Sequence, residues 1–203
     1  MKDKRAVGEF AQMVDSLCDA LTKARFPWNP SSSENRWSEV VFRCFEELAA
    51  ERRYFVRWKT RGRGSRAPAG PGEWLFDLTW SEGDPRTDAF RKLELALECE
   101  WGCGVSGRLW PNQIREELNK LLVAACPLRV LVYGTPGTGP GQHHVREALD
   151  VVRQSMSAVP GATSLSLLAV LISPGTGASR SCTVQGLAYS GETDPAPIEP
   201  RPC

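Results

Sequence analysis

Three carboxylates on two consecutive predicted strands could hold a metal ion. Side chains alternate along the apolar segment 92–101, so Glu98 and Glu100 share one face of a predicted strand. Asp77 lies in the preceding apolar run, residues 74–80, where an acidic side chain needs a partner or a cation to offset its desolvation. If the two strands pair, Asp77 approaches both glutamates. Carboxylate oxygens suit Mg²⁺ or Mn²⁺, so we predict that these three residues bind metal and act in catalysis.

The alternative interpretation of this pattern is a solvated acidic strand face. We adopt that interpretation for Glu94 and for Glu117, which lies on a later helix.

A run of basic residues just before Asp77 could bind phosphates. Seven Lys or Arg residues and no acidic residue occur between positions 52 and 66, and a segment rich in Gly and Pro follows. Such a basic segment beside an acidic centre is expected of a protein that binds nucleic acid, although a solvated loop has the same composition. The predicted nucleic-acid-binding residues are Arg57, Lys59, Arg61, Arg63 and Arg66.

Hydrophobic periodicity predicts the elements that must position these residues. Apolar steps of three and four predict helices over residues 6–24, 34–53, 112–125 and 142–158. Alternating or continuous apolar runs predict strands over residues 54–60, 74–80, 93–101, 128–133, 164–172 and 182–189. This order of elements predicts an α/β fold in which helices flank a mixed central sheet.

Composition limits the class of protein. The 203 residues carry a net charge of +1, which argues against a polycationic nucleic-acid-packaging protein and fits one domain over residues 1–189. Residues 190–203 are rich in proline and are predicted to be disordered. Seven cysteines without a C-x-x-C pair predict reduced, mostly buried thiols. Without an apolar run long enough to span a bilayer or to form a signal peptide, we expect a cytoplasmic protein that does not contact membrane.

The order of elements over residues 34–134, together with Asp77 and the Glu98-Cys99-Glu100 segment, resembles the PD-(D/E)XK nuclease superfamily. The resemblance implies a restriction-endonuclease-like αβββαβ core, here with an extra N-terminal helix and a C-terminal αββ extension. In that superfamily an aspartate of the second core strand and an acidic-x-lysine pair on the third bind Mg²⁺ or Mn²⁺ and orient the attacking water. Asp77 matches the aspartate, and Glu98 and Glu100 match the pair in its E-x-E form, with glutamate where lysine is usual.

The same resemblance implies further residues and partners. A glutamate of the first core helix often joins the site, and we favour Glu47 over Glu46 and Glu51 because it flanks the apolar stripe. Lys120, on the predicted helix after the third strand, could supply the positive charge that position 100 lacks. The expected partner is nucleic acid, in the first place DNA, and a homodimer is an option because two strands need two active sites. The alternative function is an inactive nuclease-fold protein that binds nucleic acid or serves in protein assembly.

The basic segment gives a first testable prediction. Replacing Arg61 and Arg63 together by Ala should weaken DNA binding and reduce its dependence on salt concentration, because fewer counterions are released from the phosphates. Fluorescence anisotropy with labelled duplex DNA over a series of salt concentrations measures both quantities. An unchanged salt slope would identify the segment as a solvated loop.

Overall fold

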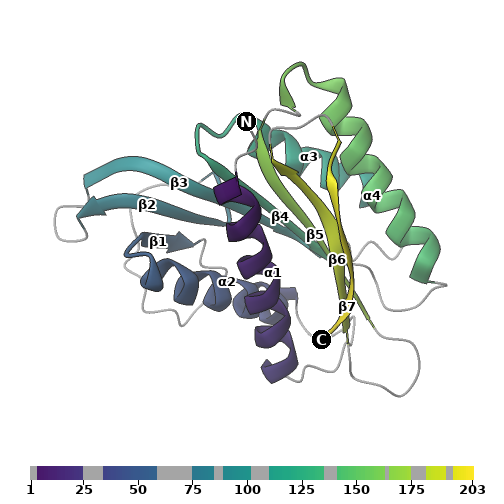
Figure 1. The fold of residues 1–203 in the computed structure, drawn as a ribbon, viewed down its shortest axis with the longest axis horizontal. Coiled ribbons are helices and arrows are strands. Elements are labelled where there is room, and N and C mark those ends of the chain that lie inside the picture. Colours follow the sequence, from purple (N-terminus) through teal and green to yellow (C-terminus); the bar gives the residue numbers. More distant parts are fainter. Residues whose placement is uncertain are drawn as a thin grey trace.

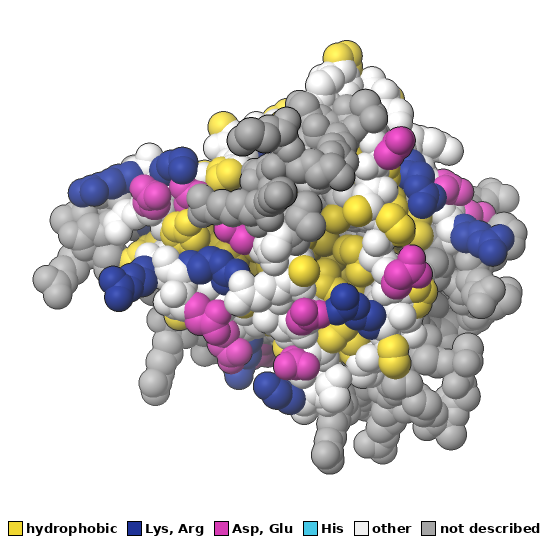
Figure 2. Space-filling model, viewed as in Figure 1, with side chains coloured by type: hydrophobic (Ala, Val, Ile, Leu, Met, Phe, Trp, Pro, Cys, Tyr) yellow, Lys and Arg dark blue, Asp and Glu magenta, His cyan; other side chains and the backbone are white. Residues whose placement is uncertain are grey.

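The computed structural model describes residues 4–24, 34–58, 75–84, 89–101, 110–134, 141–162, 165–174, 182–190 and 194–203. In these segments, no helix is both long enough and apolar enough to cross a membrane. Acidic and basic side chains lie interspersed on the face of the molecule seen in Figure 2, in keeping with the small net charge.

One mixed sheet forms the centre of the structure, and its seven strands lie side by side in chain order. Neighbouring strands are antiparallel except for the two pairs β3–β4 and β4–β5, which are parallel. Each parallel pair is joined through a helix, as parallel pairing requires. The strands are β1 (Phe55–Trp58), β2 (Leu78–Asp84), β3 (Ala89–Glu100), β4 (Leu128–Gly134), β5 (Ser166–Pro174), β6 (Cys182–Ser190) and β7 (Ala196–Pro202).

Two helices cover each face of the sheet, so the fold has three layers (Figure 1). Helices α1 and α2 share one hydrophobic cluster with the first face, and α3 and α4 share a second cluster with the other. This arrangement confirms the predicted α/β class with a mixed sheet flanked by helices. The helices are α1 (Lys4–Ala24), α2 (Glu34–Glu51), α3 (Trp110–Leu122) and α4 (Gly141–Ala158).

The burial of each element follows from its apolar pattern. All seven residues of β4 are buried, as expected for a continuous apolar strand covered by helices on both faces. In α1 the predicted apolar stripe is at most 4% exposed and faces the sheet: Phe10, Met13, Val14, Leu17 and Leu21. Trp80 and Trp101 also belong to this core, so neither ring is available to stack on a nucleic-acid base.

A bulge changes the predicted faces of β3. Simple alternation predicts that Leu93 shares a face with Leu95, yet Leu93 packs against the cluster on the α3 side. The reason is a register shift, because Trp80 pairs with Leu95 while the next residue, Ser81, pairs with Leu93. The shift leaves Glu94 opposite no residue of β2. Strand β2 also begins at Leu78, later than the predicted start of this strand at residue 74.

The C-terminal segment is ordered as strand β7, which corrects the predicted disorder of residues 190–203. Cys182 and Cys203 exchange both backbone hydrogen bonds, at 3.0 and 2.7 Å. Along two antiparallel strands, pairs of residues that exchange hydrogen bonds alternate with pairs that do not. Counted along β6 from the Cys182–Cys203 pair, Thr183–Pro202 and Leu187–Pro197 are pairs without hydrogen bonds. The nitrogens of Pro197 and Pro202 therefore face away from β6, and an edge strand tolerates prolines there.

A buried arginine holds the end of α3 against β4. Arg129 is 6% exposed; its Nε donates to the carbonyl of Leu121 at 3.0 Å, and its Nη2 to the carbonyl of Ala124 at 2.5 Å. These carbonyls belong to the last turn of the helix and the residues after it, where a cation also meets the negative end of the helix dipole. The contact fixes where the last turn of α3 lies over the sheet.

Gly186 provides a test of the packing between β5 and β6. A Cβ at this position would lie 1.9 Å from the Ala169 carbonyl oxygen, so Gly186→Ala should reduce the free energy of unfolding by about 3 kcal/mol or more. Gly8→Ala is the matched control, because a Cβ on this exposed position of α1 meets nothing within 4 Å and should stabilise the protein by about 1 kcal/mol. Urea denaturation measures both changes. Equal effects of the two substitutions would contradict the close approach at Gly186.

Candidate functional site

Asp77 lies directly before β2 and points its carboxylate toward the end of β3. The residue is 8% exposed, and its Oδ2 accepts a hydrogen bond from the backbone N–H of Cys99 at 3.0 Å. The antiparallel register pairs Leu78 with Leu97, so Asp77 comes beside Glu98. The expected approach of the two carboxylates is therefore present in the structure, and the backbone of β3 itself fixes it.

Glu98, the neighbour of Asp77 on β3, is more deeply buried than Asp77. It is 1% exposed, and its Oε1 makes no hydrogen bond and lies 3.9 Å from the Nζ of Lys120. Burial, and then the negative charges of Asp77 and Glu117, raise the pKa of Glu98 to about 9, against the opposing effect of Lys120. At neutral pH without a bound cation, Glu98 is therefore mostly protonated.

Helix α3 supplies the polar groups that face Glu98. Lys120 Nζ donates to Glu117 Oε2 at 2.5 Å, and the two residues are three positions apart on the same flank of the helix. Burial acts to lower the pKa of Lys120, but the hydrogen bond to Glu117 and the charges of Glu98, Glu117 and Asp77 outweigh it and raise the pKa. Gln113 lies on the same flank, and its buried Oε1 accepts no hydrogen bond.

The surface interpretation of Glu94 and Glu117 is wrong. Glu94 is 6% exposed, and its Oε1 is ion-paired with Lys92 without making a hydrogen bond. The Glu117 side chain is 16% exposed and bonded to Lys120. A Glu and a Lys three positions apart, flanking an apolar helix stripe, were the sequence signal that could have placed Glu117 in the cluster with Lys120.

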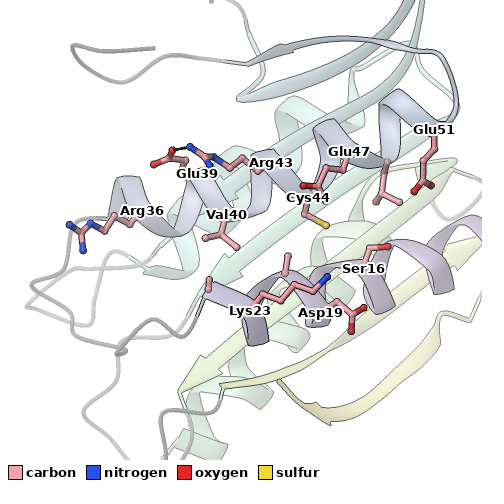
Figure 3. Close-up of a pocket in the computed structure, with 13 residues that line it drawn as sticks. Ser16, Asp19, Lys23, Arg36, Glu39, Val40, Arg43, Cys44, Glu47 and Glu51 are labelled. Atoms are coloured by element: carbon pink, nitrogen blue, oxygen red, sulfur yellow. Dashed lines mark hydrogen bonds and ion pairs between the residues drawn. The ribbon is translucent and has the colours of Figure 1, made fainter. Parts of the chain in front are cut away.

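The other two predicted catalytic residues, Glu100 and Glu47, lie in different places. Glu100 is half-buried at the end of β3, on the face of Glu98 by alternation. Glu47 lies instead in a groove of about 510 Å³ between α1 and α2, with Asp19 and Lys23 across from it (Figure 3). Because α2 covers the sheet face opposite α3, the structure does not bring Glu47 to Glu98.

The predicted nucleic-acid-binding residues are described only in part. Arg57 lies in β1, is half-buried and pairs by register with Thr79 of β2. Lys59, Arg61, Arg63 and Arg66 lie outside the described residues.

The arrangement offers oxygen donors for a cation and a lysine beside them. Within the described part of the chain, no group of three His, Cys, Asp or Glu side chains is placed to hold a metal ion. Mg²⁺ in proteins needs only one or two carboxylates when waters and substrate phosphates complete the octahedron. Asp77 and Glu98 meet that smaller requirement, and the buried Glu98 Oε1, which makes no hydrogen bond and lies 3.9 Å from Lys120 Nζ, is a candidate donor atom.

Comparison of the chain with protein-family models, with curated proteins and with solved structures gave no match.

The raised pKa of Glu98 predicts how stability depends on pH. Because folding raises this pKa from 4.5 to about 9, the protonated group contributes stability below pH 4.5 that is lost as pH rises toward 9. Glu98→Gln cannot ionise, so it should remove that loss and be more stable than wild type at pH 9, with a difference that grows as pH rises. Urea denaturation between pH 5 and pH 9 measures the difference.

Glu116→Gln is the control for this measurement, since Glu116 is exposed on the same helix. If the difference between wild type and Glu98→Gln does not change with pH, Glu98 is not the buried protonated group.

Proposed function

We propose that the protein is a metal-dependent nucleic-acid phosphodiesterase of the PD-(D/E)XK type, with Asp77 and Glu98 as metal ligands and Lys120 beside them. The observation that carries the proposal is the meeting of these three residues from different elements: the entry to β2, the end of β3 and the flank of α3. Separate elements rarely bring two carboxylates together in an interior without a function for them, because their mutual repulsion costs stability.

The order of elements supports the same assignment. Helix α2, the antiparallel strands β1, β2 and β3, helix α3 and the parallel strand β4 follow one another along the chain. This order is similar to the αβββαβ order of the restriction-endonuclease-like core, in which Asp77 and Glu98 would belong to the second and third strands.

Mg²⁺ or Mn²⁺ would bind between Asp77 and Glu98, and when bound it polarises the phosphodiester and lowers the pKa of water. The Asp77 carboxylate keeps its Oδ1 for this purpose, because Cys99 engages Oδ2. Glu98 must release its proton before it can act as a ligand, so cation affinity should rise with pH as far as the pKa of about 9.

The remaining roles belong to side chains around this pair. Lys120, 38% exposed, can turn from Glu117 toward a phosphate at the surface and stabilise the negative charge that develops on it. Glu100 is placed to act as a general base on water or as a further ligand, since it follows Glu98 on the same face and is half-buried. The basic segment before Asp77 would hold the phosphate backbone of the nucleic acid, in the first place DNA.

One observation favours the second candidate, an inactive nuclease-fold protein that binds nucleic acid or serves in assembly. Glu117 already neutralises Lys120 at 2.5 Å, and position 100 is a glutamate. In such a protein the cluster would be a self-contained polar network. Cation binding separates the two candidates, because only the first requires it.

Calorimetric titration with Mn²⁺ at pH 8 tests the proposal. Wild type should bind the ion, whereas Asp77→Asn should not, because the amide oxygen can still accept the Cys99 hydrogen bond while the charge is lost. Glu98→Gln should also lose binding although it folds more stably at high pH. In a plasmid-nicking assay with Mn²⁺, Lys120→Met should reduce the rate by about a hundredfold.

Two exposed residues provide matched controls. Glu82→Gln on β2 should leave Mn²⁺ binding unchanged, and Lys92→Met on β3 should leave nicking unchanged. Binding that survives both Asp77→Asn and Glu98→Gln would refute the metal site. If wild type does not bind Mn²⁺, the second candidate, an inactive nuclease-fold protein that binds nucleic acid or serves in assembly, is the one that remains.

A further inference from the structure

Three thiols from distant parts of the chain meet on the α1 side of the sheet. Cys18 comes from the second half of α1, Cys182 begins β6, and Cys203 directly follows β7. Cys182 belongs to the hydrophobic cluster on this face, Cys18 and Cys203 pack against the same cluster, and each of the two other thiols affects the pKa of Cys203. The Cys203 Sγ donates a hydrogen bond to the Arg201 carbonyl at 3.7 Å. Neither of the proposed metal ligands is near, since Glu98 faces α3 on the other side of the sheet.

The backbone and a neighbouring ion pair hold this cluster in place. Cys182 and Cys203 exchange backbone hydrogen bonds at 3.0 and 2.7 Å, which sets the end of β7 beside β6. Asp15 of α1 forms an ion pair with Arg201 of β7, one helical turn before Cys18 and two residues before Cys203. The ion pair thus holds α1 to the end of β7, close in sequence to Cys18 and Cys203. Figure 1 shows the course of the two elements.

The three thiols differ in their access to solvent. Cys18 and Cys203 are half-buried, whereas Cys182 is 6% exposed. The other described cysteines, Cys44, Cys99 and Cys126, are buried. A small oxidant in solution can therefore reach Cys18 and Cys203 most readily.

We propose that Cys18 and Cys203 are a site of reversible oxidation, at which a hydroperoxide converts the two neighbouring thiols into a disulfide that joins α1 to β7. In the first step the Cys203 sulfur attacks the peroxide, the O–O bond breaks, and a sulfenic acid and an alcohol, or water from hydrogen peroxide, are formed. In the second step the Cys18 sulfur attacks that sulfenic acid, the S–S bond forms, and water leaves with the second thiol proton. Two sulfur atoms are oxidised and one peroxide is reduced.

Cys182 lies beside the attacking sulfur and influences its protonation, but contributes no atom to the disulfide. The thiolate is the nucleophilic form of a cysteine, so Cys203 must lose its proton before it attacks. The hydrogen bond with Cys18 acts to lower the pKa of Cys203, but the hydrogen bond with Cys182 and burial outweigh it and raise the pKa of Cys203 to about 12. The Cys203 thiolate is therefore scarce at neutral pH, and the rate of oxidation should rise with pH.

Hydrogen peroxide treatment of the full chain, followed by mass spectrometry without reduction, tests the proposal. The expected product has lost two hydrogen atoms and is restored by dithiothreitol. Digestion with trypsin and a glutamate-specific protease, which cuts after Glu192, separates Cys182 from Cys203 and identifies the linked residues. We expect one cross-link, between Cys18 and Cys203, and a higher melting temperature for the oxidised protein because a long loop is closed.

Single substitutions complete the test. Cys18→Ala and Cys203→Ala should each abolish the cross-link and the shift in melting temperature, whereas Cys126→Ser, at a buried thiol away from the cluster, should retain both. Cys182→Ala should still form the cross-link, because Cys182 contributes no sulfur to the disulfide, and should form it faster because the hydrogen bond that raises the pKa of Cys203 is lost. A cross-link between any other pair, or peroxide treatment that leaves both thiols free to be alkylated, would overturn the proposal.

Discussion

The space between β3 and α3 must accommodate several charged groups, and the rest of the structure is arranged to make that possible. Glu98 is enclosed there with Asp77, Glu117 and Lys120, so that one lysine faces more negative charge than it can neutralise. The positions of these groups are fixed from outside the cluster. The Cys99 N–H holds Asp77, and Arg129 binds the carbonyls that end α3. A buried cluster of like charges persists only where the surrounding fold determines its geometry in this way.

Much of the architecture was predictable because it depends on apolar periodicity. The stripe of α1 and the continuous apolar run of β4 are each long enough to exclude other interpretations, and both are buried as expected. The order of elements then leads to a mixed sheet between two helical layers, since parallel strands need a crossover. For the same reason, Asp77 and Glu98 could be paired from sequence, because consecutive strands are commonly neighbours in a sheet.

The features that were not predicted depend on register or on tertiary contacts. The bulge opposite Trp80 moves Leu93 to the other face of β3, and no residue type in the sequence marks that position. Glu47 flanks the apolar stripe of α2, but which flank faces the site depends on how α1 packs beside it. The prolines of residues 194–203 indicate disorder by composition, whereas an edge strand accepts them when they alternate in step with the pairing.

The prolines of β7 have a consequence for assembly. A proline nitrogen cannot donate a hydrogen bond, so the outer side of β7 has few donors with which to bind a strand of another chain. At the opposite edge, β1 has only four residues. Open sheets can aggregate when the edge strands of two copies pair into one continuous sheet. The prolines make such pairing unfavourable at β7. A homodimer that cleaves two strands of a duplex would associate through helices or connecting segments, and its two sheets would remain separate.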